Sequence, residues 1–123
     1  MANPFNDQKT FMVAGDQTVS EFNSSQYEMY KNLIKEEYSE LFDDAENLVD
    51  ELDALVDILV VTIGAIYSMG VDAQDAWDEV MRTNFAKIDP ATGKCRKRED
   101  GKILKGPDWT PPNLKPFLKH TDK

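Results

Sequence analysis

Residues 35–70 read KEEYSELFDDAENLVDELDALVDILVVTIGAIYSMG, and this stretch decides the fold because its acids and its apolar residues both recur at helical spacing. Side chains three or four residues apart share one face of a helix. The acids of residues 36–40 therefore lie together, and those of residues 50–57 form a second stripe. Two such stripes on consecutive helices can face each other.

Acids at these spacings need either solvent or a cation, because each like-charged pair destabilises a helix by about 0.2–0.5 kcal/mol. The acids could form a metal site, because hard divalent ions such as Mg²⁺ bind carboxylate oxygens. The simpler alternative is a solvated acidic helix face, and spacing alone does not decide between the two. The position of Asp57 supports the interpretation as a metal site, because this acid interrupts the apolar run of residues 55–61. A carboxylate in such surroundings needs a partner.

Apolar periodicity and capping residues predict four helices. The first covers about residues 6–14 and the second about residues 26–42, while residues 43–47 either turn or continue the helix. The third helix runs to Met69 with Gly70 as its stop, and the fourth covers about residues 73–86. The third helix is apolar on more than one side, which indicates a central position or a subunit interface.

The segment after the fourth helix carries turn signals and prolines. Asp100-Gly101 between two short extended pieces predicts a small hairpin, and three prolines in residues 109–116 exclude a continuous helix there. We expect Trp109 and Phe117 to anchor an extended arm. The sequence thus predicts one all-α domain over residues 1–123, with a core of about 26–88 and a basic C-terminal arm of 89–123.

Charge is unevenly distributed along the 123 residues, whose net charge is −9. Residues 1–86 hold four Lys/Arg against eighteen Asp/Glu, whereas residues 87–123 hold ten against five. The acidic total argues against a general binder of nucleic acid or of anionic membranes. A single cysteine, Cys95, excludes an intrachain disulfide, and we expect a soluble, cytoplasmic protein.

Five segments, taken in order, resemble the all-α nucleoside triphosphate pyrophosphohydrolases of the MazG and phosphoribosyl-ATP pyrophosphohydrolase type, particularly short phage and bacterial members. The segments are EEYSE at 36–40, DILVVTIG at 57–64, MGVD at 69–72, DEVMRTNFAK at 78–87 and REDGKILKGP at 98–107. The resemblance covers roughly residues 27–109. It implies a MazG-like four-helix bundle with the hairpin and arm described above.

The chain departs from this family at its second signature, Glu-x-x-Asp. If Asp57 is aligned with the Asp, Ala54 stands where Glu is expected and Asp53 has to substitute for it. If Asp53 is aligned instead, Asp50 takes the Glu position. Both alignments include Asp53, so Asp53 and Asp57 are the better candidate ligands.

The resemblance implies that Mg²⁺ or Mn²⁺ is bound and that water attacks the α-phosphorus of a nucleoside triphosphate, which releases a monophosphate and pyrophosphate. It assigns metal binding to Glu37, Glu40, Asp53 and Asp57. Glu36 is the candidate general base or a further ligand, so Glu36 and Glu37 are the candidate catalytic residues. The implied contacts to substrate are Arg82, Asn84, Lys87, Lys102 and Lys105.

The resemblance also implies a role in adjusting or cleaning the deoxynucleotide pool, and dGTP is the most specific candidate substrate among the dNTPs. It implies a homodimer or homotetramer in which helices of two chains complete a site. Tyr30, Trp77, Phe85 and Trp109 are candidates for stacking on a base, although a buried core position is the first expectation for each of them. The alternative from a different class is a non-catalytic helical adaptor whose acidic face binds a basic protein.

Overall fold

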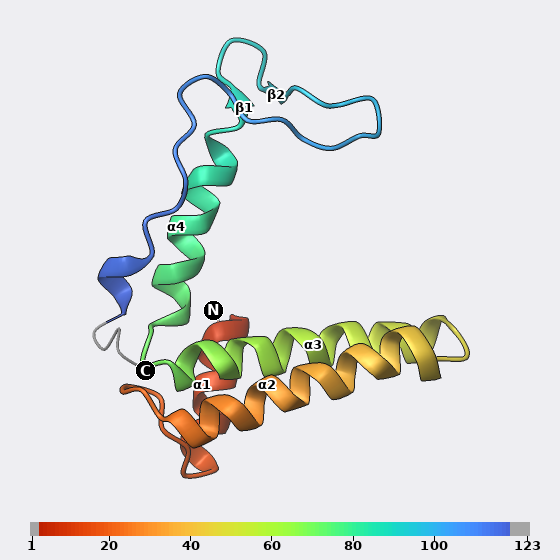
Figure 1. The fold of residues 1–123 in the computed structure, drawn as a ribbon, viewed down its shortest axis with the longest axis vertical. Coiled ribbons are helices and arrows are strands. Elements are labelled where there is room, and N and C mark those ends of the chain that lie inside the picture. The colour runs from red at the N-terminus through yellow and green to blue at the C-terminus, as the bar shows by residue number, and fades with distance from the viewer. Residues whose placement is uncertain (1–2, 119–123) are drawn as a thin grey trace. The chain divides into compact units, whose positions relative to one another are not determined.

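The computed structural model describes residues 3–118, which form two compact units: residues 3–73 with Leu118, and Gln74–Phe117. The first unit contains the helices α1 (Pro4–Ala14), α2 (Ser24–Ser39) and α3 (Leu48–Ser68) (Figure 1). Both ends of the predicted domain lie outside the described residues. The prediction of a single domain over residues 1–123 stays a prediction.

Asparagine side chains begin all three helices of the first unit. Asn3 caps α1 by accepting the Asn6 N–H at 2.8 Å, Asn23 caps α2, and Asn47 caps α3 by accepting the Asp50 N–H at 2.9 Å. As a result, α1 and α2 start about two residues earlier than the sequence predicted.

The connection between α2 and α3 is a π-helical turn over Glu40–Asp44 followed by a short loop. The Ala45 N–H donates to the Glu40 carbonyl at 2.8 Å, which closes this wider turn. The second helix therefore leaves α-helical geometry at Ser39, three residues before the predicted end. At the other end of α3, Gly70 has a φ of +76° and ends the helix as predicted.

The helices α2 and α3 run side by side and antiparallel, and α1 also packs on α3 (Figure 1). Their contact is close at Gly64, where an added Cβ would lie 2.3 Å from Cε1 of Tyr30. Tyr30 is 4% exposed, and its hydroxyl donates to Gln17. The core of this unit contains Met12, Tyr30, Ile63, Ala65, Tyr67 and Ala73.

Toward its N-terminus, α3 presents large apolar side chains that the single chain leaves exposed. Leu48 is 80% exposed and Leu52 63%. The complete set on α3 is Leu48, Val49, Leu52, Leu55, Val56, Leu59 and Val60. Within the described residues, no helix combines the length and hydrophobicity that crossing a membrane would require.

The second unit begins with most of α4 (Ala73–Phe85) and continues into short extended pieces. Strands β1 (Ile88–Asp89) and β2 (Lys94–Cys95) pair antiparallel. Around the predicted Asp100-Gly101 turn, the Arg98 N–H donates to the Lys102 carbonyl at 2.7 Å, so the small hairpin is present. Among residues 3–118, four α-helices and a minimal sheet confirm the predicted all-α class.

Candidate active site

Three carboxylates converge between α2 and α3. Glu37 lies in the last turns of α2, Glu40 is the first residue of the π-helical turn, and Asp57 lies on α3. One oxygen from each of the three side chains lies within 4.8 Å of the others. Glu37 and Glu40 meet because they are three residues apart, and Asp57 joins them because α3 runs back along α2.

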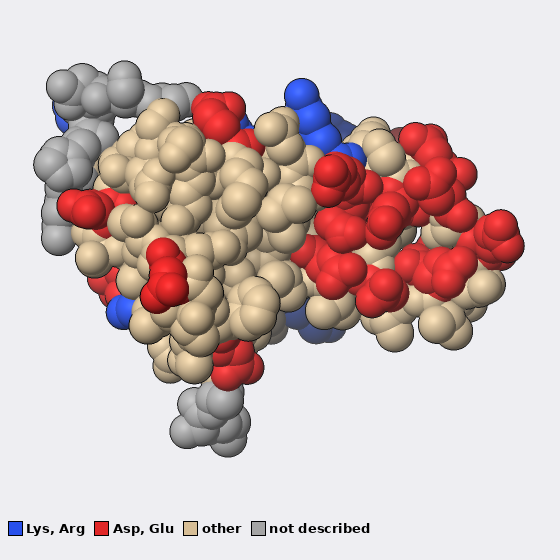
Figure 2. All heavy atoms as spheres, turned by 90° about the horizontal axis from the view of Figure 1, so that it is seen from below, with Lys and Arg blue, Asp and Glu red and all other residues tan. Residues whose placement is uncertain are grey.

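The surroundings of this cluster are uniformly acidic. Residues 36–57 contain ten Asp/Glu and no Lys or Arg. Figure 2 shows red side chains gathered at the end of the first unit where α2 leads into α3. The described ion pairs are Lys31–Glu28, Arg82–Glu79 and Arg98–Asp100, so within residues 3–118 no cation pairs with the cluster.

This arrangement raises the pKa of Glu37 from 4.5 to about 7. Partial burial is the largest cause, because it disfavours the charged carboxylate. A hydrogen bond to Glu40 and the negative charges of Asp57, Glu40 and Asp53 raise the pKa further. Near neutral pH, Glu37 can therefore hold a proton in the absence of a cation and release it when a cation binds.

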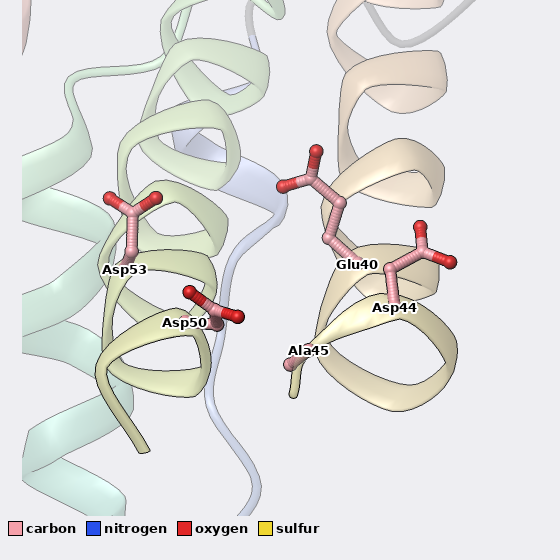
Figure 3. A pocket seen from close by; sticks show the side chains of 5 residues that line it. All are labelled: Glu40, Asp44, Ala45, Asp50 and Asp53. Carbon is pink, nitrogen blue, oxygen red and sulfur yellow. The ribbon is translucent and has the colours of Figure 1, made fainter. Parts of the chain in front are cut away.

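A second group of carboxylates lies beside the cluster, toward the turn between the helices. A pocket of about 220 Å³ is lined by Glu40, Asp44, Ala45, Asp50 and Asp53. Figure 3 shows the Glu40 carboxylate directed from its helix toward α3, which carries Asp50 and Asp53. Glu40 thus belongs to both the cluster and the pocket. Asp53 adds charge near Glu37 but does not belong to the group of three.

The donor set fits a hard divalent cation. Mg²⁺ binds oxygen ligands at about 2.0–2.1 Å, so ligand oxygens around it lie at most about 4.2 Å apart. The observed limit of 4.8 Å is close to this value, and Glu40 is exposed and Glu37 and Asp57 only half-buried. Small side-chain rotations would bring the oxygens into range.

The other predicted acids lie outside the cluster. Glu36 is exposed on α2 and is absent from the group of three. Asp50 accepts the Glu46 N–H at 3.1 Å, which helps to shape the turn before α3. The roles assigned to these residues stay predictions.

The five predicted substrate contacts all lie in the second unit. Lys87 donates from Nζ to Asn84 Oδ1 at 3.1 Å, so these two polar side chains form one group at the end of α4. The Lys105 ammonium lies 4.2 Å from the centre of the Trp109 ring. The Lys102 N–H donates to Asp100 in the hairpin turn.

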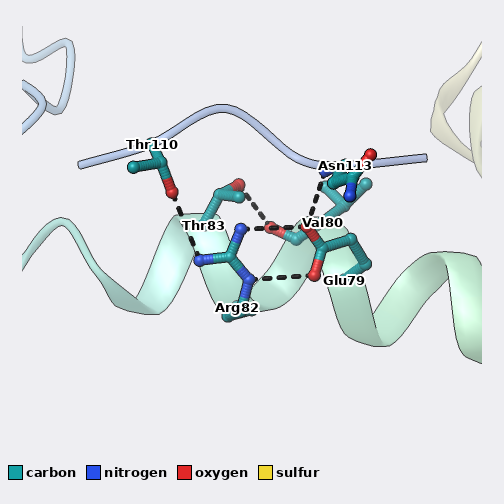
Figure 4. Close-up of polar contacts among 6 residues, drawn as sticks. All are labelled: Glu79, Val80, Arg82, Thr83, Thr110 and Asn113. Carbon is teal, nitrogen blue, oxygen red and sulfur yellow. Dashed lines mark hydrogen bonds and ion pairs between the residues drawn. The ribbon is translucent and has the colours of Figure 1, made fainter. Parts of the chain in front are cut away.

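Arg82 has partners that the sequence interpretation overlooked. Its Nε and Nη2 donate to the two carboxylate oxygens of Glu79, both at 2.9 Å (Figure 4). Glu79 also accepts the Asn113 N–H at 2.6 Å. The spacing of three residues between Glu79 and Arg82 on a helix is a signal that could have identified this pair.

The aromatic candidates for a base site differ in accessibility. Tyr30 is buried in the core, whereas Trp77 is 51% and Phe85 60% exposed. Trp109 is partly buried, and its indole N–H is buried without a hydrogen-bond partner among the described residues.

A family model described as phosphoribosyl-ATP pyrophosphohydrolase matches residues 8–84. This range includes α2, α3, most of α1 and α4, and all three clustered carboxylates. No protein with curated annotation matches the sequence.

Proposed function

Because the chain belongs to the phosphoribosyl-ATP pyrophosphohydrolase family, we propose that it is a metal-dependent enzyme that hydrolyses a (deoxy)nucleoside triphosphate to the monophosphate and pyrophosphate. Family membership confirms the resemblance that the motifs predicted, and it implies nucleotide pyrophosphohydrolase activity in general. The triphosphate substrate, with dGTP as the first candidate, and the metal requirement are the proposal.

The convergence of Glu37, Glu40 and Asp57 is the observation that carries the proposal. Three carboxylates without a Lys or Arg partner repel one another, and a divalent cation removes that repulsion. These three residues would hold Mg²⁺ or Mn²⁺, with Asp53 beside them. A bound ion would neutralise phosphate charge and lower the pKa of a coordinated water.

The chain itself offers two candidates for the general base. The raised pKa of Glu37, about 7, suits proton transfer near neutral pH, but a residue that holds a cation cannot also accept a proton freely. Glu36 is outside the cluster and exposed, so it keeps its carboxylate available. We therefore propose Glu37 as a ligand and Glu36 as the base.

Positively charged residues of the second unit would neutralise the substrate phosphates. Lys87, which Asn84 orients, Lys102 and Lys105 are the candidates whose ammonium groups pair with no carboxylate among the described residues. Their charge complements that of a triphosphate.

The test is turnover of a panel of dNTPs and NTPs, together with phosphoribosyl-ATP, in the presence of Mg²⁺ or Mn²⁺. We expect monophosphate and pyrophosphate from at least one triphosphate, and Glu37→Gln and Glu40→Gln should abolish turnover. Asp43→Asn is the matched control, because it removes an exposed acid from the same stretch but outside both cluster and pocket. Turnover of phosphoribosyl-ATP without turnover of any free dNTP or NTP would refute the assignment to a free nucleoside triphosphate.

A metal titration separates this enzyme from a non-catalytic acidic adaptor. Millimolar Mn²⁺ should raise the melting temperature of the wild-type protein by binding linkage, and it should do so much less for Glu40→Gln. An adaptor with a solvated acidic face would show the same small response in both proteins.

We also propose that the exposed apolar face of α3 mediates self-association into a homodimer or homotetramer. Seven large apolar side chains on this one helix are at least 37% exposed, and exposed apolar patches mark protein–protein contacts. The face continues into an apolar groove of about 330 Å³ next to α1. Light scattering coupled to size exclusion should report more than one chain per particle.

A further inference from the structure

The C-terminal arm returns to α4 and is fastened there by two side chains. The Asn113 N–H donates to Glu79 Oε2 at 2.6 Å, and Arg82 Nη1 lies 3.5 Å from Thr110 Oγ1 (Figure 4). These contacts join residues that are 34 and 28 positions apart in the sequence. We call Glu79, Arg82, Thr110 and Asn113 the clasp.

Glu79 is the centre of the clasp. Its side chain is 16% exposed, whereas that of Arg82 is 50% exposed. Both of its oxygens accept from Arg82, and one of them also accepts from the arm. Hydrogen bonds from Arg82 and from the Asn113 backbone lower the pKa of Glu79 to about 2, so it remains ionised under ordinary conditions.

The clasp joins the two ends of the segment between Arg82 and Thr110, which contains most of the predicted phosphate contacts. Lys87, Lys102 and Lys105 all lie between Arg82 and Thr110 in the sequence. Without a fixed far end, a segment of this length has many conformations, and ordering it on binding costs entropy. A clasp formed in the free protein reduces that cost.

We propose that Glu79 is a positioning residue that holds Arg82 and residues 110–113 together, and that Arg82 anchors the arm instead of binding phosphate. This inference rests on the proposed function only for its kinetic consequence. The bidentate pair occupies Nε and Nη2 of Arg82, and Nη1 faces Thr110.

Hydrogen–deuterium exchange of the metal-free full chain tests the clasp without requiring activity. Glu79→Ala should accelerate exchange of the Asn113 amide roughly tenfold or more, since its hydrogen bond to a charged group is lost. Asp78→Asn is the matched control, because Asp78 lines one surface pocket with Glu79 and Arg82 but accepts from Gln74 and has no described hydrogen bond to the arm. Unchanged α2 exchange would show that the variant folds.

Steady-state kinetics then tests the positioning role. Glu79→Gln and Arg82→Gln should each raise KM for the nucleotide several-fold with a smaller change in kcat, and the double variant should resemble either single one. Equal arm exchange in wild type and Glu79→Ala would overturn the clasp. Additive KM effects, or an Arg82→Gln effect without faster arm exchange, would overturn the reassignment of Arg82. A wild type inactive on every nucleotide would refute the proposed function, and the exchange measurement would still decide the clasp.

Discussion

Replacing Gly64 by alanine should destabilise the first unit and also weaken metal binding. The contact between Tyr30 and Gly64 lies seven residues from Glu37 along α2 and seven residues from Asp57 along α3. Seven residues of helix span about 10.5 Å, so this contact sets the separation of the helices two turns from the cluster. Pushing the helices apart at Gly64 should therefore disturb the carboxylates.

The magnitude follows from the distances. An alanine Cβ would lie 2.3, 2.6 and 2.7 Å from three ring atoms of Tyr30, whereas carbon atoms in contact normally lie about 3.5–4.0 Å apart. The ring or the helix has to move by about 1 Å, and such overpacking costs about 1–3 kcal/mol. Disturbing the hydrogen bond to Gln17 adds about 1 kcal/mol, and the better helix propensity of alanine returns a similar amount. We expect a net loss of about 1–3 kcal/mol.

Urea unfolding followed by far-UV circular dichroism measures this loss, and repeating it with Mn²⁺ reports the effect on the cluster. Tyr30→Ala supplies the control background, because it removes the ring that the new methyl group meets. In that background Gly64→Ala should be neutral or stabilising by up to about 1 kcal/mol. A neutral Gly64→Ala in the wild type, or the same cost in both backgrounds, would refute the packing argument.

Three further predictions concern the acids and the apolar face of α3. Folding raises the pKa of Glu37 from 4.5 to about 7, so the folded protein binds this proton more tightly than the unfolded chain does. The resulting contribution to the free energy of unfolding is fully present below pH 4.5 and is lost as the pH rises through 7. Urea unfolding with chelator should thus show a fall in stability over this window that Glu37→Gln lacks; identical profiles would contradict it. Mn²⁺ affinity, measured by calorimetry, should increase over the same window because the ion displaces the proton, and a pH-independent affinity would exclude Glu37 as a ligand. Leu55→Lys, which places a charge on a side chain that is 50% exposed, should shift light-scattering mass toward the monomer without changing helix content, whereas Phe11→Lys on α1 serves as an exposed apolar control.

The sequence located the helices well where a single residue determines an end. Gly70 stops α3 through its positive φ. For residues 43–47 the sequence left a turn and a continued helix both open, and in the structure the π-helical turn ends at Asp44 and α3 begins at Leu48. The starts were less accurate because several polar residues near each start could cap the helix, and Asn3 and Asn23 are the ones that do. The π-helical turn was not predicted, since its hydrogen bonding depends on how α2 joins α3 and has no local composition signal.

The candidate site was predictable only in part. Spacing brought Glu37 and Glu40 together, but the antiparallel register of α2 and α3 decides that Asp57, and not Asp53, completes the group of three. Such a register comes from packing at contacts such as the one at Gly64. Trp77 was expected to be buried and is 51% exposed, because helical periodicity does not reveal which side of α4 the rest of the unit covers.

The absence of any Lys or Arg from residues 36–57 has a practical consequence for handling the protein. In dilute buffer with a chelator, only the diffuse cloud of monovalent counterions screens the negative charges of these ten acids, which Glu37 reduces when it is protonated, and that cloud extends about 30 Å at 10 mM salt. This end of the molecule should then open before the rest does, and proteases should cut there first. Storage with a divalent salt, or with more sodium chloride, should keep this end of the molecule folded and resistant to proteases.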